Sequence, residues 1–98
     1  MIILSVCSDP TRSAARSSAL QSGRFRVIAA QSLPQAWSRA DGFEIAAVVL
    51  DHEFANDIGA AAFQQSYITL QLNENTTDAD LLMELSGLLG KNTSAAVN

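Results

Sequence analysis

The residues best suited to chemistry follow the apolar run Ala46-Ala47-Val48-Val49-Leu50, which leads directly into Asp51-His52-Glu53. An apolar run without period-two alternation is typical of a strand that helices cover on both faces. Such a strand ends where the run ends, so Asp51 is predicted at the carboxyl edge of a parallel sheet. Ligands and reactive groups gather at that edge in open α/β sheets. Asp51 is therefore the residue that a functional interpretation has to explain.

Three other reactive side chains lie near predicted strand ends. His52 and Glu53 could form a metal cluster with Asp51, but neighbours in an extended segment point to opposite faces. One histidine without a spaced partner is also weak evidence for a metal, so we expect His52 in a solvated loop and no metal site. Cys7 as a nucleophile would need a basic partner that the sequence does not assign. We favour the interpretation of Cys7 as a small buried hydrophobe.

Composition indicates one globular domain. The chain has 98 residues, of which 48% are hydrophobic and 16% charged, with a formal net charge of -4. The six basic residues are scattered, so the electrostatic footprint of a nucleic-acid-binding protein is missing. A single cysteine cannot form an internal disulfide, which favours a reducing compartment. Neither a signal peptide nor a membrane-spanning run is recognisable, so a cytoplasmic protein without a membrane partner is predicted.

The elements that must position Asp51 alternate between strand and helix. Strands are predicted at 2–6, 25–30, 46–50 and 67–72, and helices at 11–22, 33–41, 54–66 and 77–91. This βαβαβαβα order forces parallel pairing with right-handed crossovers, and the chain is too short for a closed barrel. The predicted fold class is α/β, a three-layer open parallel sheet of four strands.

The ends of two predicted helices carry further expectations. Gly23 is predicted to end the first helix in a left-handed conformation. The last helix is the clearest amphipathic one, because leucines recur at intervals of three and four at Leu81, Leu82, Leu85, Leu88 and Leu89. Residues 1–91 therefore form the predicted domain. Residues 92–98 form a small polar tail with no internal reason to be ordered.

In this order the residues resemble the receiver domain of two-component response regulators. Ile3 to Pro10 is similar to the first strand and acidic turn of that family, and Phe25-Arg26-Val27 is similar to its second strand. Val48-Val49-Leu50-Asp51 places the aspartate where the family has its phosphoacceptor. Residues 75–89 are similar to the last helix of the family. The resemblance implies a receiver-like fold of the flavodoxin-like type, here with four strands in the order 2-1-3-4, and a role in phosphorelay signal transduction.

The same resemblance implies a phosphorylation machinery that this sequence lacks. The acidic pair that holds Mg²⁺ in the family falls at Cys7 and Ser8, with Asp9 one place later. Thiols and hydroxyls are poor ligands for a hard cation that must offset the charge of a transferring phosphoryl group. The threonine or serine of the fourth strand and the lysine of the fifth are missing as well, since Lys91 follows the last helix. The chain also has room for only four of the usual five strand–helix units.

The leading hypothesis is a pseudo-receiver that is not an enzyme, needs no cofactor and acts by protein–protein interaction. A missing fifth strand would leave the strand with Tyr67, Thr69 and Gln71 at an exposed edge, without a lysine or proline to guard it. Exposed edges are normally relieved by pairing. The expected partner is therefore a second copy of the chain, giving a homodimer, or another signalling protein.

Two alternatives keep chemistry at the sheet edge. In the first, Asp51 accepts a phosphoryl group from a histidine kinase, and Asp9 with Glu53 holds Mg²⁺ in an irregular site. In the second, the chain is a small hydrolase or nucleotide binder that uses Cys7 or Asp51. The isolated glycines form no phosphate loop and no base is assigned, which disfavours the second alternative.

Overall fold

Strand and helix alternate along the whole chain. The computed structural model describes the backbone of residues 1–97 and the side chains of residues 1–90. The elements are β1 (Ile2–Val6), α1 (Pro10–Ser22), β2 (Arg26–Ala30), α2 (Leu33–Ala40), β3 (Ile45–Leu50), the 3₁₀ turn η1 (His52–Phe54), α3 (Ile58–Ser66), β4 (Thr69–Gln71) and α4 (Asp78–Val97). The predicted order of strands and helices is confirmed.

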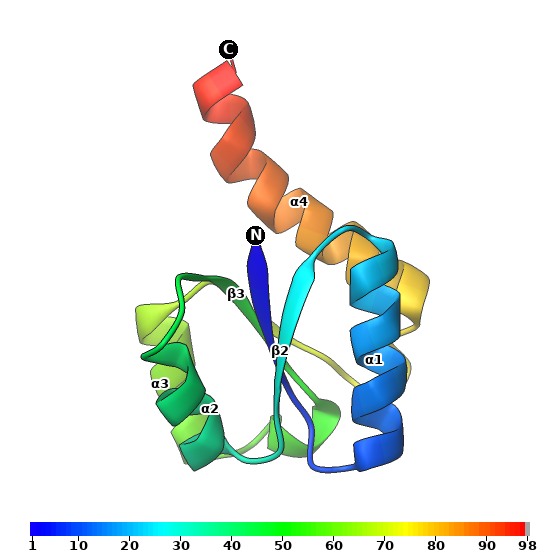
Figure 1. The fold of residues 1–98 in the computed structure, drawn as a ribbon, viewed down its shortest axis with the longest axis vertical. Helices are drawn as coiled ribbons and strands as arrows, with labels where there is room; N and C mark the ends of the chain where they lie inside the picture. Colours follow the sequence, from blue (N-terminus) through cyan, green and yellow to red (C-terminus); the bar gives the residue numbers. More distant parts are fainter. Residues whose placement is uncertain (98) are drawn as a thin grey trace.

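The four strands of residues 1–97 form one parallel sheet in the order β2-β1-β3-β4. In the centre, Leu4 of β1 is in register with Ile28 of β2 and Val48 of β3. On the other side of β3, Val49 lies opposite Leu70 of β4. Figure 1 shows α1 on one face of the sheet and α2 with α3 on the other. The predicted fold class, a three-layer open sheet with strand order 2-1-3-4, is confirmed.

Each face of the sheet has its own apolar core, which explains why β1 and β3 are apolar without alternation. The core under α2 and α3 contains Leu4, Val6, Ala30, Leu33, Ala36, Ala40, Val48, Leu50, Phe54, Ala60 and Phe63. The core under α1 and α4 contains Ile3, Leu20, Ala47, Val49, Leu72, Leu81, Leu85 and Leu89. The last helix therefore packs beside α1, and β4 stays at the edge of the sheet.

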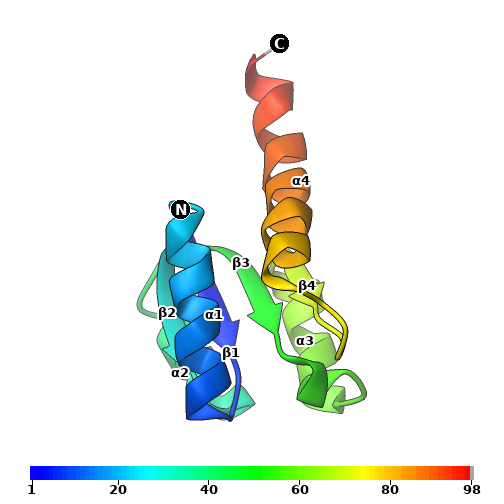
Figure 2. The same ribbon diagram turned by 90° about the vertical axis from the view of Figure 1, so that its right-hand side faces the viewer.

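The carboxyl end of α4 differs from its prediction. The sequence predicts a helix end near Gly90 and Lys91, but α4 continues to Val97. A glycine inside a helix costs only about 1 kcal/mol and no proline follows it, so nothing local stops the helix. Figure 2 shows the second half of α4 extending beyond the sheet. Most of the expected polar tail is thus helical, Asn98 lies outside the described residues, and the division at residue 91 stays a prediction.

None of the helices over residues 1–97 is both long enough and apolar enough to cross a membrane.

Gly23 has a different role from the predicted one. Its φ is -85°, and the left-handed residue after α1 is Arg24, with a φ of 70°. A Cβ at Gly23 would lie 2.7 Å from Cδ2 of Leu82 on α4. The absence of a side chain therefore lets α4 approach the end of α1. Packing between two helices explains this glycine, and a left-handed turn does not.

From the end of β3 to β4, fewer residues are in regular secondary structure than the sequence predicts. The expected helix at 54–66 is divided into η1 and α3, and the Asp57 carboxylate caps α3 by accepting a hydrogen bond from the Gly59 N–H at 2.8 Å. The expected strand at 67–72 is reduced to β4. Tyr67 is not part of it, because its N–H donates to the Phe63 carbonyl at 2.8 Å. The ring of Phe63 stacks on Trp37 with centroids 4.1 Å apart, and Tyr67 completes this aromatic cluster.

Candidate functional site at the carboxyl edge of the sheet

Asp51 lies where the sequence places it, directly after β3. Its N–H donates to the Val6 carbonyl of β1 at 3.0 Å, so the two central strands hold its backbone. The side chain is fully buried, with 0% of its surface exposed. A buried carboxylate is costly unless positive charge or hydrogen bonds compensate it. The rest of the site provides that compensation.

Two arginines of α1 contact Asp51. Arg12 Nη2 donates to Asp51 Oδ2 at 2.8 Å, and Arg16 Nη1 lies 2.8 Å from Asp51 Oδ1. The second pair is not aligned for a hydrogen bond, so it acts as an ion pair. Each carboxylate oxygen therefore contacts its own guanidinium. The Arg16 side chain is 14% exposed and the Arg12 side chain 42%, which makes Arg16 the more deeply buried partner.

The start of α1 explains why these arginines reach β3. Pro10 occupies the first turn, where its missing N–H costs nothing. The Asp9 carboxylate caps the helix by accepting hydrogen bonds from the N–H groups of Thr11 at 2.8 Å and Arg12 at 3.2 Å. Residues four apart lie on one side of a helix, so Arg12 and Arg16 face the sheet edge together. A tightly capped helix directly after β1 thus directs two cations at the end of β3.

Glu53 joins this network from the 3₁₀ turn. Its Oε2 lies 3.0 Å from Arg12 Nη2, and its Oε1 accepts a hydrogen bond from the Ser8 N–H at 3.2 Å. The expectation that Asp51, His52 and Glu53 diverge is therefore wrong, because η1 curls the chain and returns Glu53 to the site. His52 also stays close, with Nδ1 3.5 Å from Asp51 Oδ1 and 34% of its side chain exposed.

The electrostatics keep Asp51 ionised. Burial alone raises the pKa of Asp51, but the guanidinium groups of Arg16 and Arg12 outweigh burial and lower it from 3.8 to about 2. The same contact raises the pKa of Arg12. At neutral pH the site is thus a fixed carboxylate held between two fixed cations. Such an arrangement resembles a structural ion cluster more than an acid or base that exchanges protons.

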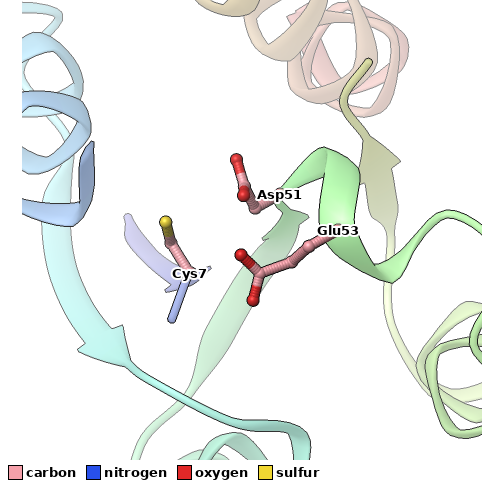
Figure 3. Close-up of side chains that lie close together, drawn as sticks. All are labelled: Cys7, Asp51 and Glu53. Carbon is pink, nitrogen blue, oxygen red and sulfur yellow. The ribbon is translucent and has the colours of Figure 1, made fainter. Parts of the chain in front are cut away.

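The residues near Asp51 do not fit Mg²⁺ well. Sγ of Cys7 and carboxylate oxygens of Asp51 and Glu53 lie within 4.8 Å of one another, and Figure 3 shows the three side chains converging. A thiol is a poor ligand for this hard cation, and guanidinium groups contact both oxygens of Asp51. Asp9, the other ligand expected under the phosphoacceptor alternative, lies outside this cluster and caps α1.

Cys7 and Ser8 directly follow β1, as the predicted strand boundary at residue 6 requires. Cys7 is fully buried, and its Sγ donates weakly to the Asp9 carbonyl at 3.6 Å. Ser8 is exposed, and its N–H donates the hydrogen bond to the Glu53 carboxylate described above. At the two positions where the receiver family has carboxylates, this chain thus has a buried thiol and a surface hydroxyl. Among the described side chains of residues 1–90, the Cys7 thiol bonds to Asp9 and the Ser8 N–H to Glu53, and neither residue bonds to the Asp51 carboxylate.

Sequence reasoning missed the two arginines that dominate the site. Arg12 and Arg16 carried a signal, since they are four residues apart on the helix that directly follows the first strand. That helix begins at the same sheet edge where Asp51 was expected. A search for cations spaced one helical turn apart beside a predicted strand-end acid would have found them.

The residues expected at the exposed edge lie in different settings. Thr69 and Gln71 belong to β4, but Tyr67 ends α3 and packs in the aromatic cluster. The Gln71 amide donates to the carbonyls of Asp51 at 3.0 Å and Leu72 at 2.9 Å. The Gln71 side chain therefore ties β4 to the site and is less free than its predicted role implied.

Comparisons with known proteins relate this architecture to receivers. Neither a scan of protein-family models nor a search of curated proteins finds a match. Among solved structures, the chain is similar to the Vibrio cholerae chemotaxis protein CheY4, with a TM-score of 0.69, 16% identity and coverage of 87% of this chain and 95% of that one. It is also similar to a response regulator receiver domain protein from Clostridium thermocellum, with a TM-score of 0.71, 13% identity and coverage of 96% and 98%.

A third similar structure is a fusion protein. It is a yeast Spc42 trimeric coiled-coil segment fused to another protein, with a TM-score of 0.78, 14% identity and coverage of 98% of this chain and 83% of that one. At these identities the likeness concerns the fold. The chain has the receiver fold of response regulators, built over residues 1–97 on a four-stranded parallel sheet.

Proposed function

We propose that this chain is a receiver-like signal-transduction module that works by protein–protein interaction and not by phosphoryl transfer. One observation carries the proposal: Arg12 and Arg16 each lie 2.8 Å from an oxygen of the buried Asp51 carboxylate. A phosphoacceptor oxygen has to be free to attack. Here the two oxygens at the corresponding position are committed to ion pairs within the chain.

The surroundings of Asp51 support the same proposal. Phosphoryl transfer relies on positioned cations that offset charge on the transferring group. The guanidiniums at this site offset Asp51 itself, and Arg12 also contacts Glu53 at 3.0 Å. The lysine of the receiver pattern has no counterpart before Lys91. The module is accordingly proposed as a pseudo-receiver that carries one strand–helix unit fewer than the receiver pattern that its sequence resembles.

The edge strand β4 is the proposed interaction surface. The Ile68 carbonyl accepts from Val48, and the Leu72 N–H donates to Leu50, so backbone groups of alternate residues face β3. By that alternation the N–H and carbonyl of Thr69 and Gln71 point away from the sheet. An open strand edge is a template for pairing with another chain. We therefore propose a homodimer through β4, with another signalling protein as the alternative partner.

Treatment with Mg²⁺ and acetyl phosphate is expected to leave the intact mass of the chain unchanged, because the Asp51 oxygens are held by arginine. Mass spectrometry of the wild-type chain and of Asp51→Asn provides the measurement. A gain of one phosphoryl group in the wild type that is absent from Asp51→Asn would establish the phosphoacceptor alternative and refute the proposal. Equal gains in both chains would indicate modification elsewhere, and Asp51 would still be unreactive.

Light scattering at high micromolar concentration is expected to give about twice the mass of one chain if β4 pairs with a second copy. Thr69→Pro removes an N–H that points away from β3, and it should weaken this association by about tenfold while the fold is retained. Thr69→Ala is the matched control and should dimerise normally. A strictly monomeric wild-type chain would contradict the homodimer.

A further inference from the structure

The opposite edge of the sheet has a groove that the proposed function does not use. The strand β2 is the outermost strand on that side and has five residues, against three in β4. A groove of about 780 Å³ follows it between α1 and α2. Its lining includes Val27 and Ala29 of β2, Ser13 and Ser17 of α1, and Arg39 of α2. The groove thus combines an open strand with two flanking walls.

The backbone of β2 offers hydrogen-bonding groups to this groove. The Arg26 N–H donates to the Met1 carbonyl at 3.0 Å, and the Ala30 carbonyl accepts from the Cys7 N–H at 2.9 Å. Alternate residues of β2 therefore face β1. In a parallel pair this leaves the N–H and carbonyl groups of Val27 and Ala29 pointing outward. An added strand could bond to both residues, as in peptide recognition by strand addition.

The two walls of the groove differ in chemistry. The wall from α1 is made of small side chains, with Ser13, Ala14 and Ser17 along it, so it leaves room for apolar side chains of an added strand. The wall from α2 contributes Gln35 and Arg39. Side chains of a strand alternate between the two faces of a sheet. An added strand would therefore place every second side chain against the small residues and the others beside Arg39.

Charge favours an acidic occupant. Arg26 begins β2 and lies on the same strand face as Ile28, which packs in the core under α2. Arg39 belongs to α2, so both arginines lie on this side of the sheet. Both arginines are exposed, and neither forms an ion pair with the described side chains of residues 1–90. Although the chain has a net charge of -4, these two arginines place unpaired positive charge beside an open strand. Two copies paired through β2 would bring like charges together, which disfavours a second copy here.

We infer that the β2 edge binds an extended segment of a partner protein in which acidic and apolar residues alternate. The segment adds a fifth strand next to β2, bonds to the outward groups of Val27 and Ala29, and directs its carboxylates at Arg39 and Arg26. Its apolar side chains lie over the small residues of α1. This site is independent of β4, and it holds whether or not the chain dimerises.

A fluorescein-labelled heptapeptide of alternating valine and glutamate is the probe, and fluorescence anisotropy with the full chain is the measurement. Binding of this peptide is expected, together with at least about tenfold weaker binding for Arg39→Glu and for the same peptide with lysine in place of glutamate. Ala29→Pro removes an outward N–H from β2 and should also weaken binding about tenfold. Thr69→Pro, on the other edge, is the matched control and should bind normally.

A peptide methylated at alternate backbone nitrogens repeats the test without altering the protein, so a folding defect in Ala29→Pro does not decide the result. The methylated peptide keeps its charges and should lose binding. Failure of the unmodified peptide to bind overturns the inference. Binding that survives both methylation and Ala29→Pro also overturns it, because attraction of surface charges would then suffice. A dimer mass that falls in Ala29→Pro but not in Thr69→Pro would assign the edge to a second copy instead.

Discussion

Replacing Arg16 with alanine is expected to lower the free energy of unfolding at pH 7 by about 3 kcal/mol. Arg16 is the more buried of the two guanidiniums at Asp51, 2.8 Å from a carboxylate oxygen. Without Arg16, Arg12 alone has to compensate the charge of the fully buried Asp51 side chain, and the Arg12 side chain is 42% exposed. Breaking a buried ion pair from one side is strongly destabilising because the other charge stays in a poorly solvated place. Urea denaturation followed by circular dichroism measures the loss.

Arg39→Ala is the control for this experiment, because Arg39 is an exposed helical arginine without an ion pair to the described side chains. It should change the free energy of unfolding by less than about 0.5 kcal/mol. The double variant Arg16→Ala with Asp51→Asn should be less destabilised than the two single changes added together, since the charge that needs a partner is gone. A cost for Arg16→Ala no larger than that of Arg39→Ala would show that the ion pair contributes nothing to stability.

Acidification is expected to remove about 2 kcal/mol of stability through Asp51 between about pH 5 and pH 2. The folded chain has an Asp51 pKa of about 2, against 3.8 without the fold. The folded pKa is the lower one, so the unfolded chain takes up this proton first as the pH falls. The contribution is complete above the unfolded pKa and is lost progressively towards the folded one. Thermal or urea unfolding at a series of pH values measures it.

Asp51→Asn separates this carboxylate from the others, which also titrate in that range. The difference in unfolding free energy between the wild-type chain and Asp51→Asn should shrink by about 2 kcal/mol from pH 5 to pH 2. A difference that stays constant across this range would mean that Asp51 has an ordinary pKa and that the arginines do not hold its charge.

The two stability predictions bear directly on the proposed function. A receiver aspartate that accepts a phosphoryl group has to be available to a reagent from outside the chain. In this chain two arginines of α1 contact the carboxylate at the junction of β1, β3 and α1. Under the proposed function this acid stabilises the fold, and the sheet edges bind the partners. Each edge can be tested by its own proline variant.

The sequence by itself determined the fold class and the place of Asp51. Two patterns were sufficient to predict the fold class: apolar runs without alternation, and the regular change of hydrophobic period between strand and helix. A parallel strand that is buried on both faces is apolar at successive positions, so its burial can be read from the sequence. The run ending at Leu50 placed the acid at the carboxyl edge, and the structure has it there. The strand order 2-1-3-4, which the resemblance to receiver domains implied, is also present in the structure.

Only the tertiary structure decided what surrounds Asp51 and how the helices close on the sheet. Arg12 lies 39 residues from Asp51 in sequence, and its contact depends on the cap that starts α1 and on the reach of a long side chain, which the spacing of Arg12 and Arg16 does not fix. Glu53 returns to the site through a 3₁₀ turn that no periodicity marks. Gly23 is explained by the approach of Leu82 on α4, a contact between segments far apart in the chain. Local periodicity records burial, whereas these contacts depend on distances between elements that are set only when the whole core packs.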